Sequence, residues 1–181
     1  MSAEKIVDLV HDEQTPPETV ALLQESLERA LELIFHADTG LEVTLEIASA
    51  ERVCELNREL RGKDSATDVL SFPEFFEEQM DGGKDEGYSP FSRWFIEEAA
   101  RLGAALPAPA EGQVPPVLFL GEIALDLEFS LNWARENGAE ESEHLRLLVV
   151  HSLLHLAGLD HLEDESADKM EGLETAILKK M

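Results

Sequence analysis

Apolar and polar residues follow two regular patterns along the first part of the chain. From residue 16 to about residue 37, apolar positions recur every three or four residues, which predicts an amphipathic helix capped by Thr15 with Pro16 and Pro17 in its first turn. The apolar positions of this helix are Val20, Leu23, Leu27, Leu31 and Ile34. Residues 41–48 alternate strictly between apolar and polar, as a half-buried strand does.

The remaining elements follow from similar patterns. Further helices are predicted over about 50–60, 127–137 and 141–157, a last amphipathic helix within 162–180, and strands at 68–73 and 117–125. The helix at 141–157 is apolar on almost every side, which predicts burial. The order of elements begins with a helix and ends with three helices. It predicts an α+β fold in which a small mixed β-sheet packs against about five helices.

Residues 74–117 differ in composition from the sequence on either side. Acidic, glycine-rich and proline-rich stretches surround one apolar piece, in which Ser89 and Pro90 suit the start of a short helix that ends before Gly103. Long loops of this kind are either functional or loosely ordered. We therefore interpret residues 1–181 as a single domain with a flexible insertion at about 74–117, and we favour a surface excursion docked on the core over a substrate lid.

The chain is strongly acidic, with 39 Asp and Glu residues against 14 Lys and Arg residues and a formal net charge of −25. Such a field repels nucleic acid, because binding to a phosphate backbone normally depends on clustered Lys and Arg. Four of the few basic residues do cluster, namely Arg52, Arg58, Arg61 and Lys63. Local clustering can outweigh the net charge, so this segment is the candidate for a contact with phosphate.

Composition also bears on the cellular setting and on the chemistry of any metal site. No stretch reaches the ~18 consecutive apolar residues of a membrane span, and the N-terminus lacks the layout of a signal peptide. A soluble, cytoplasmic protein without a membrane partner is expected. Because Cys54 is the only cysteine, neither an intramolecular disulfide nor a cysteine zinc cluster can form, and metal ligands would be histidines and carboxylates.

The segment HSLLHLAGLDH, residues 151–161, carries three histidines around a glycine. His151 and His155 share one face of the buried helix, where two imidazoles would cost free energy unless something binds their lone pairs. Gly158 can end the helix and let the chain return His161 towards the pair. Three histidines leave a fourth position open on zinc, which is the catalytic arrangement. We predict a metal site, with zinc favoured and nickel, cobalt or iron not excluded.

Ser152 stands where zinc peptidases with this histidine pattern carry a glutamate general base. A serine is a very weak base, and amide hydrolysis, with its poor leaving group, would suffer most from the replacement. Cleavage of a phosphodiester depends instead on positioning and on neutralising charge at the phosphoryl oxygens, which a metal ion and an arginine can share. Arg61 lies in the basic cluster and is the arginine that suits this role.

Three segments together resemble the YbeY-type endoribonucleases of bacterial ribosomal RNA maturation. Residues 56–73 (LNRELRGKDSATDVLSFP) resemble the family's arginine-containing segment, residues 120–125 (LGEIAL) its central strand, and residues 151–161 its metal motif. The resemblance spans about Leu41 to the C-terminus. It implies a single-strand-specific, zinc-dependent endoribonuclease that acts on rRNA, chiefly near the small-subunit 3′ end, and that takes part in ribosome quality control.

The same resemblance implies roles for individual residues. His151, His155 and His161 match the ligands of one zinc ion, and Arg61 matches the family's functional arginine, which is expected to hold a phosphate near the metal. The sequence also departs from the family's usual pattern at three positions, with Ser152 in place of glycine, Leu159 in place of an aromatic residue and Glu122 in place of aspartate.

Several other residues keep two interpretations. Asp160 either orients a ligand imidazole or caps the end of the helix. Arg58 and Lys63 either contact RNA or are solvated charges. Met170 is interpreted as a core residue rather than as the methionine of a metzincin turn. The other histidines are interpreted as ordinary core or surface residues, and they are His11, His36 and His144.

Two other classes of function stay open beside the nuclease. A metzincin-like peptidase would explain only the histidines, and a non-catalytic ribosome-assembly factor would use the metal only to hold its fold. For the nuclease, attack by a metal-activated water and attack by the RNA's own 2′-hydroxyl both suit these residues. The expected partners are rRNA and either ribosomal subunits or ribosomal proteins, which would supply affinity that the acidic chain lacks. DNA is not expected as a partner.

Overall fold

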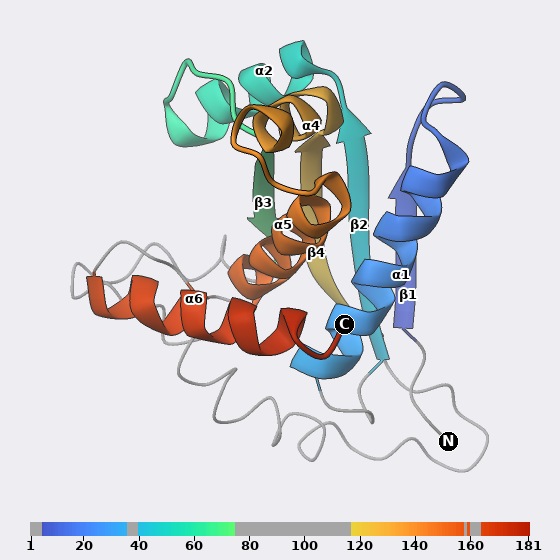
Figure 1. Cartoon of the computed structure of the whole chain (residues 1–181), viewed down its shortest axis with the longest axis vertical. Coiled ribbons are helices and arrows are strands. Elements are labelled where there is room, and N and C mark those ends of the chain that lie inside the picture. The colour runs from blue at the N-terminus through green and yellow to red at the C-terminus, as the bar shows by residue number, and fades with distance from the viewer. Residues whose placement is uncertain (1–4, 36–39, 75–116, 158, 160–163) are drawn as a thin grey trace.

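The computed structural model in Figure 1 describes residues 5–35, 40–74, 117–157, 159 and 164–181. In chain order its elements are β1 (Lys5–Val10), α1 (Pro17–Ile34), β2 (Gly40–Ala48), α2 (Ala50–Arg61), β3 (Val69–Pro73), β4 (Val117–Asp126), α4 (Leu127–Glu136), α5 (Glu141–Leu156) and α6 (Asp164–Leu178). The predicted α+β class is confirmed. Each helix and strand predicted outside the insertion is found within a few residues of its expected bounds.

The four described strands form one mixed sheet in the order β1-β2-β4-β3. β1 is parallel to β2, and β2 is parallel to β4, whereas β3 runs antiparallel to β4. Parallel neighbours need a crossover connection, and α1 supplies the one between β1 and β2. The small mixed sheet predicted from the order of elements is therefore confirmed.

The prediction that the chain begins with a helix is wrong, because β1 precedes α1. The sequence of β1, KIVDLV, places apolar residues next to one another instead of alternating them, and the strand lies at the edge of the sheet, where it is only partly buried. Its conformation depends on parallel pairing with β2, from Lys5 opposite Leu41 to Val10 opposite Glu46. Hydrophobic periodicity cannot report a pairing with a strand that lies further along the chain.

The start of α1 also differs from the prediction. The N-cap position is Pro16, which forms no side-chain cap, and Pro17 is the first helical residue. Thr15 does not cap the helix because its hydroxyl donates to Oδ1 of Asp12 at 3.1 Å, and the same oxygen accepts the backbone N–H of Thr15 at 2.9 Å. A proline at the first helical position has no N–H that needs a partner, which reduces the need for a cap.

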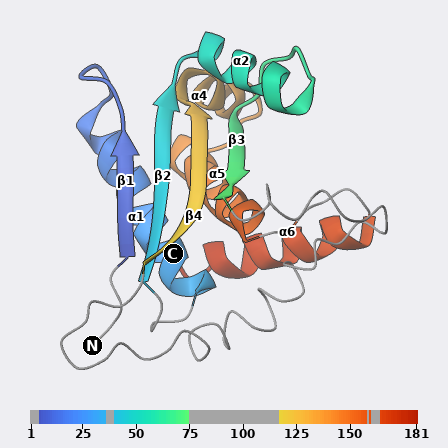
Figure 2. The same ribbon diagram turned by 180° about the vertical axis from the view of Figure 1, so that it is seen from behind.

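The main core lies between one face of the sheet and the helices α1, α5 and α6. Figures 1 and 2 show α1 and α5 against the same face of the sheet, and α6 packs against both helices. The predicted apolar stripe of α1 is inside, with Leu23, Leu27 and Leu31 fully buried. The prediction that the helix after residue 141 is buried is confirmed, because its apolar side chains enter the core along most of its length.

α2 covers part of the opposite face of the sheet. Successive residues of a strand point to opposite faces, and Ile123 of β4 belongs to the main core. Its neighbour Ala124 instead joins a separate small cluster with Val53 of α2 and Leu70 of β3. The first half of α2 is therefore anchored on the far side of the sheet from the main core.

A bulge in β4 lies next to a very close approach between β3 and β4. The register with β2 shifts so that Phe119 lies opposite Glu42 but Gly121 lies opposite Val43. Gly121 has a φ of +134°, and a Cβ atom at this position would lie 2.1 Å from the backbone oxygen of Phe72. Only glycine fits here, which explains why a glycine interrupts this apolar strand.

The insertion predicted at 74–117 falls almost entirely within residues 75–116, which lie outside the described residues, as does His36. The two strands that bound it are described, since β3 ends at Pro73 and β4 begins at Val117. β3 and β4 are antiparallel neighbours, so the segment leaves and rejoins the sheet at adjacent strands.

Among the helices that the structure describes, none is long and apolar enough to cross a membrane.

Candidate functional site

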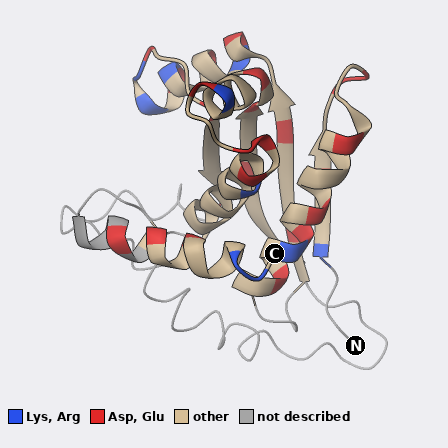
Figure 3. Cartoon of the chain, viewed as in Figure 1, with Lys and Arg blue, Asp and Glu red and all other residues tan. Residues whose placement is uncertain are grey.

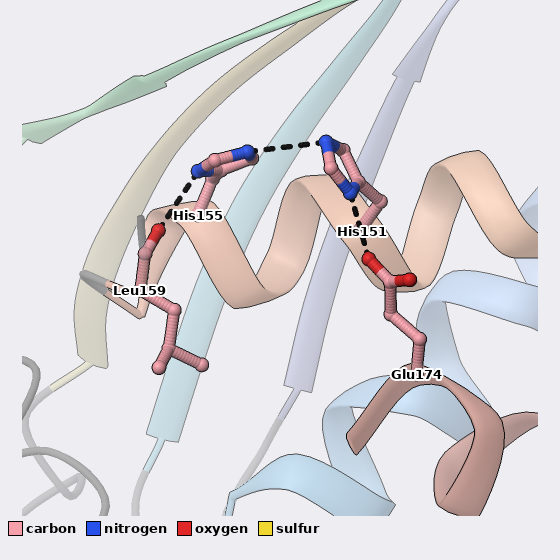
Figure 4. Close-up of polar contacts among 4 residues, drawn as sticks. All are labelled: His151, His155, Leu159 and Glu174. Atoms are coloured by element: carbon pink, nitrogen blue, oxygen red, sulfur yellow. Dashed lines mark hydrogen bonds and ion pairs between the residues drawn. The ribbon is translucent and has the colours of Figure 1, made fainter. Parts of the chain in front are cut away.

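The last two turns of α5 present the first two predicted ligands, His151 and His155, side by side. Their spacing places them one turn apart on one face, and Figure 4 shows the two rings turned towards each other. The two Nε2 atoms lie 3.1 Å apart, and the ring planes are 84° apart. Two nitrogens bound tetrahedrally to one zinc ion at about 2.0–2.1 Å lie about 3.3 Å from each other. The pair therefore has close to the separation that a shared metal requires.

The other ring nitrogen of each histidine contacts an oxygen atom. Nδ1 of His155 lies 2.8 Å from the carbonyl oxygen of Leu159, and Nδ1 of His151 lies 2.7 Å from Oε1 of Glu174. A carbonyl oxygen can only accept, so Nδ1 of His155 carries the proton and Nε2 presents a lone pair. A carboxylate acceptor favours the same tautomer at His151. Two lone pairs aimed at each other repel unless a proton or a cation lies between them, so this donor set fits a zinc ion.

The turn after α5 holds the carbonyl group of Leu159 against His155. The backbone N–H of Leu159 donates to the carbonyl oxygen of Leu154 at 3.0 Å. A bond of this span is typical of a helix that ends in a left-handed residue, most often glycine. Gly158, where the sequence predicts the helix end, itself lies outside the described residues.

The remaining residues of the predicted metal motif also lie outside the described part of the chain. These are His161, the third predicted ligand, and Asp160, the predicted partner or cap. Within the described ranges, no group of three or more His, Cys, Asp or Glu side chains is arranged to hold a metal ion. The described part of the site is therefore the pair His151 and His155 with the oxygen atoms that contact them.

Glu174 is a site residue that the sequence analysis missed. It lies on α6, four residues after Met170 and three before Ile177, both of which are buried, as the core interpretation of Met170 predicted. The side chain of Glu174 is only 14% exposed. A carboxylate among the apolar positions of an amphipathic helix is a signal in the sequence, because a buried charge without a partner is costly. Its partner lies 23 residues away, and no local pattern could identify it.

Ser152 takes the place of the peptidase glutamate, and it is fully buried. Its hydroxyl forms no hydrogen bond with any residue that the structure describes. One residue along the helix turns a side chain by about 100°, so Ser152 does not share the face of His151. A buried hydroxyl without a hydrogen-bond partner is also poorly placed to accept a proton from a bound substrate.

Three of the four residues of the predicted basic cluster lie at the C-terminal end of α2, which Gly62 terminates in a left-handed conformation with a φ of 67°. Arg58, Arg61 and Lys63 are exposed, and their side chains form no ion pair or hydrogen bond with another described residue. Arg52 lies further back on the helix, 3.9 Å from a carboxylate oxygen of Glu55. Figure 3 shows basic residues gathered at this end of α2. The cluster is therefore accessible to an anionic partner.

The structure brings His151 and His155 together, but it does not bring Arg61 to them. No hydrogen bond or ion pair joins Arg61 to either histidine. Figures 1 and 2 show α2 at one end of the sheet and α6, which supplies Glu174, towards the other. Different helices therefore position the basic residues and the histidine pair, and the expectation that Arg61 holds a phosphate near the metal stays a prediction.

His144, near the start of α5, is a buried histidine outside this pair. Its side chain is 6% exposed, and its ring stacks on Trp133 with ring centres 4.5 Å apart. Nε2 of His144 has no hydrogen-bond partner among the described residues. Burial lowers the pKa of His144 below its usual value, and the negative charge of Asp68 opposes this by a smaller amount.

We expect the free energy of unfolding to fall as the pH drops through the ordinary histidine pKa of 6.5, in part because of His144. The unfolded chain binds this proton at a higher pH than the folded chain does. The stability that His144 contributes is therefore present above that pKa and is lost as the pH falls through the lower folded-state pKa. His144→Phe keeps an aromatic ring on Trp133 and should make the slope shallower by at most about 1.4 kcal/mol per pH unit.

Urea unfolding over this pH range measures the effect of His144→Phe. His11→Gln, at an exposed position, is the matched control for loss of a histidine. An unchanged slope in His144→Phe would show that the buried ring does not set the pH dependence.

The fold and the histidine pair together define an α+β protein with a candidate metal-binding site on a buried helix. The sequence profile of the family described as Endoribonuclease YbeY matches residues 8–181 of the chain. The chain therefore belongs to the endoribonuclease YbeY family.

Individual relatives agree with this assignment. A protein of Rhodospirillum rubrum named Endoribonuclease YbeY is 39% identical over 140 residues, which cover 77% of this chain but only 55% of that relative. One of the same name from Listeria monocytogenes is 31% identical, with 95% of this chain and 92% of the relative covered. The solution structure of a Thermotoga maritima protein matches with a TM-score of 0.52 at 22% identity, over 97% of this chain and 87% of that one. This last match supports the fold.

Proposed function

We propose that the chain is a single-strand-specific, zinc-dependent endoribonuclease that acts in the cytoplasm on rRNA near the small-subunit 3′ end and takes part in ribosome quality control. One observation carries the proposal. In a chain of the endoribonuclease YbeY family, two histidines on a buried helix direct their Nε2 atoms to one point while their Nδ1 atoms contact oxygen acceptors. This is the arrangement in which histidines bind zinc.

In this proposal His151, His155 and His161 hold the zinc ion. When bound, zinc would supply electrophilic stabilisation of the phosphate and lower the pKa of a water molecule. The chain supplies the rigid support, since α5 is buried and the turn at Leu159 fixes the ring of His155. The buried position of Ser152 is consistent with a reaction that does not use this residue as a base.

Arg61 binds a phosphate of the RNA strand, with Arg58 and Lys63 as further contacts. All three side chains are exposed and stand without carboxylate partners among the described residues, so binding a phosphate would not require breaking an ion pair. The net charge of −25 limits the affinity that three contacts can provide. A ribosomal subunit or a ribosomal protein therefore supplies most of the binding energy.

Removing the metal is expected to abolish RNA cleavage, and adding zinc back should restore it. The measurement is cleavage of a labelled single-stranded rRNA fragment by the full chain, before and after treatment with a chelator and then with Zn²⁺. The same fragment in a duplex is the control for strand specificity. Analysis of the product 3′ ends as phosphate or hydroxyl separates attack by the 2′-hydroxyl from attack by water.

Two results would count against the proposal. Cleavage by metal-free protein would separate the activity from the histidine pair. No cleavage by the zinc-loaded protein, together with association with ribosomes that survives Arg61→Ala, would favour a non-catalytic assembly factor.

A further inference from the structure

The contact between His151 and Glu174 joins two helices that are far apart in the sequence. Oε1 of Glu174 lies 2.7 Å from Nδ1 of His151, across 23 residues. Figure 4 shows the glutamate reaching His151 from α6, while the other ring nitrogen of His151 is turned towards His155. Met170 and Ile177, about one turn before and after Glu174 on α6, are both buried. The packing of this helix against the core therefore places the carboxylate of Glu174 beside the ring of His151.

The two histidines are supported by different kinds of acceptor. His155 contacts a neutral backbone carbonyl in the turn that directly follows its own helix. His151 contacts a carboxylate that reaches it only when α6 packs against α5. Hydrogen bonds to a charged acceptor are shorter and about twice as strong as neutral ones. The carboxylate that contacts the ring of His151 therefore comes from a distant element, whereas the carbonyl that contacts His155 belongs to the adjoining turn.

We propose that Glu174 is a positioning residue, which holds the ring and the tautomer of His151 so that its Nε2 atom meets that of His155 at one metal ion. This inference rests on the proposed function, because it takes the metal site as its starting point. Loss of a carboxylate that orients a ligand histidine typically lowers metal affinity by about 10–100-fold. Metal binding and the packing of α6 on α5 are then coupled, and each strengthens the other.

Three variants of α6 test this role. Glu174→Leu removes the acceptor by replacing the carboxylate with an apolar side chain of similar size. Glu174→Gln instead provides an amide oxygen that can still accept a hydrogen bond. The matched control is Glu171→Gln, which removes one negative charge from an exposed position of the same helix. Far-UV circular dichroism of the full chain checks that each variant folds. If Glu174→Leu fails to fold, Glu174→Ala, which also removes the acceptor, takes its place in every comparison.

The first measurement is the affinity for Zn²⁺ alone, by competition with a chromophoric chelator. Glu174→Leu should bind zinc about 10–100-fold more weakly than the wild type, and Glu174→Gln should lose less. Glu171→Gln should stay within about twofold of the wild type, as surface substitutions usually do.

Two further measurements distinguish positioning from a general structural role. The nitrogen chemical shifts of the His151 ring should report a proton on Nδ1 in the zinc-loaded wild type and in Glu174→Gln, but a mixture of tautomers in Glu174→Leu. Hydrogen exchange of the α6 amides should slow when zinc is added to the wild type. In Glu174→Leu, which lacks the contact between Glu174 and His151, zinc should slow this exchange much less.

The outcomes separate this inference from the proposed function. Zinc affinity in Glu174→Leu within about twofold of the wild type, or an equal loss in Glu171→Gln, would overturn the positioning role. So would a wild-type chain that binds no zinc. If the variants lose zinc affinity in the expected order but the zinc-loaded wild type cleaves no RNA, the positioning role stands and the nuclease is refuted. Zinc-dependent RNA cleavage by the wild type, together with an unchanged zinc affinity in Glu174→Leu, would support the nuclease and refute the positioning role.

Discussion

Replacing His155 with alanine should lower the rate of RNA cleavage by at least about 10³-fold, because metal-ion catalysis is worth several kcal/mol and each 1.4 kcal/mol is a factor of ten. The variant removes the imidazole that faces His151 at 3.1 Å. It also removes the contact with the carbonyl oxygen of Leu159. The side chain is only partly buried, so the fold should survive the change. The measurement is cleavage of the labelled single-stranded rRNA fragment, with zinc content determined on the same sample.

His11→Ala is the matched control for His155→Ala. His11 is exposed, it lies at the end of β1, and its ring contacts the backbone oxygen of Asp12 rather than the site. The control should cleave RNA as fast as the wild type. A purified Arg61→Ala sample should bind zinc normally but cleave slowly, because the role proposed for Arg61 is to bind the phosphate, and its side chain forms no hydrogen bond or ion pair with the two described histidines. Equal cleavage by all samples would mean that a contaminating nuclease was being measured.

Gly121→Ala should lower the free energy of unfolding by at least about 3 kcal/mol, since a strained backbone conformation alone is worth about 1–3 kcal/mol and the steric clash adds to it. The new Cβ would lie 2.1 Å from the backbone oxygen of Phe72 and 3.0 Å from Cα of Pro73. Both obstacles are backbone atoms, so β3 would have to move away from β4. Domains are commonly stable by only about 5–15 kcal/mol, so much of the margin would be lost.

Gly172→Ala makes the same chemical change as Gly121→Ala but should have the opposite effect on the free energy of unfolding. Gly172 lies within α6, and among the described residues a Cβ there would meet no atom within 4 Å apart from the local backbone of its own helix. Alanine at this position should stabilise the protein by about 0.4–1 kcal/mol, because it reduces the conformational entropy of the unfolded chain. Urea unfolding of both variants measures the difference. A Gly121→Ala variant within about 1 kcal/mol of the wild type would show that β3 and β4 can separate at little cost.

Most elements of the fold were predictable because each one carries a local periodic signal. The alternation in β2 and the stripe of α1 led to bounds close to those of the structure. β1 carries no such signal, because it is a partly buried edge strand whose apolar residues are adjacent in the sequence. The cap of α1 was mispredicted for a similar reason. Thr15 has the right side chain, but Asp12 engages it instead.

The candidate site likewise contains some residues that the sequence predicts and others that it does not. The pair His151 and His155 was recognisable because a spacing of four on a helix determines which side chains are neighbours. Glu174 was not, since its relation to His151 depends on how α6 packs against α5. The contact of His155 with the Leu159 carbonyl could not be predicted either, because every residue has a backbone oxygen and the residue type does not show which one is used. The positions of His161 and Asp160 stay predictions.

The sequence alone determined the described helices and strands other than β1, the buried character of α5 and the two histidines that share its face. These follow from periods of 3.6 and 2 residues, which act over a single helix or strand. Only the tertiary structure decided the pairing of β1, the order of the strands, the placement of α2 away from α6, and the carboxylate of Glu174 beside His151. These features depend on contacts between distant segments, which burial of a shared core selects and local sequence cannot encode.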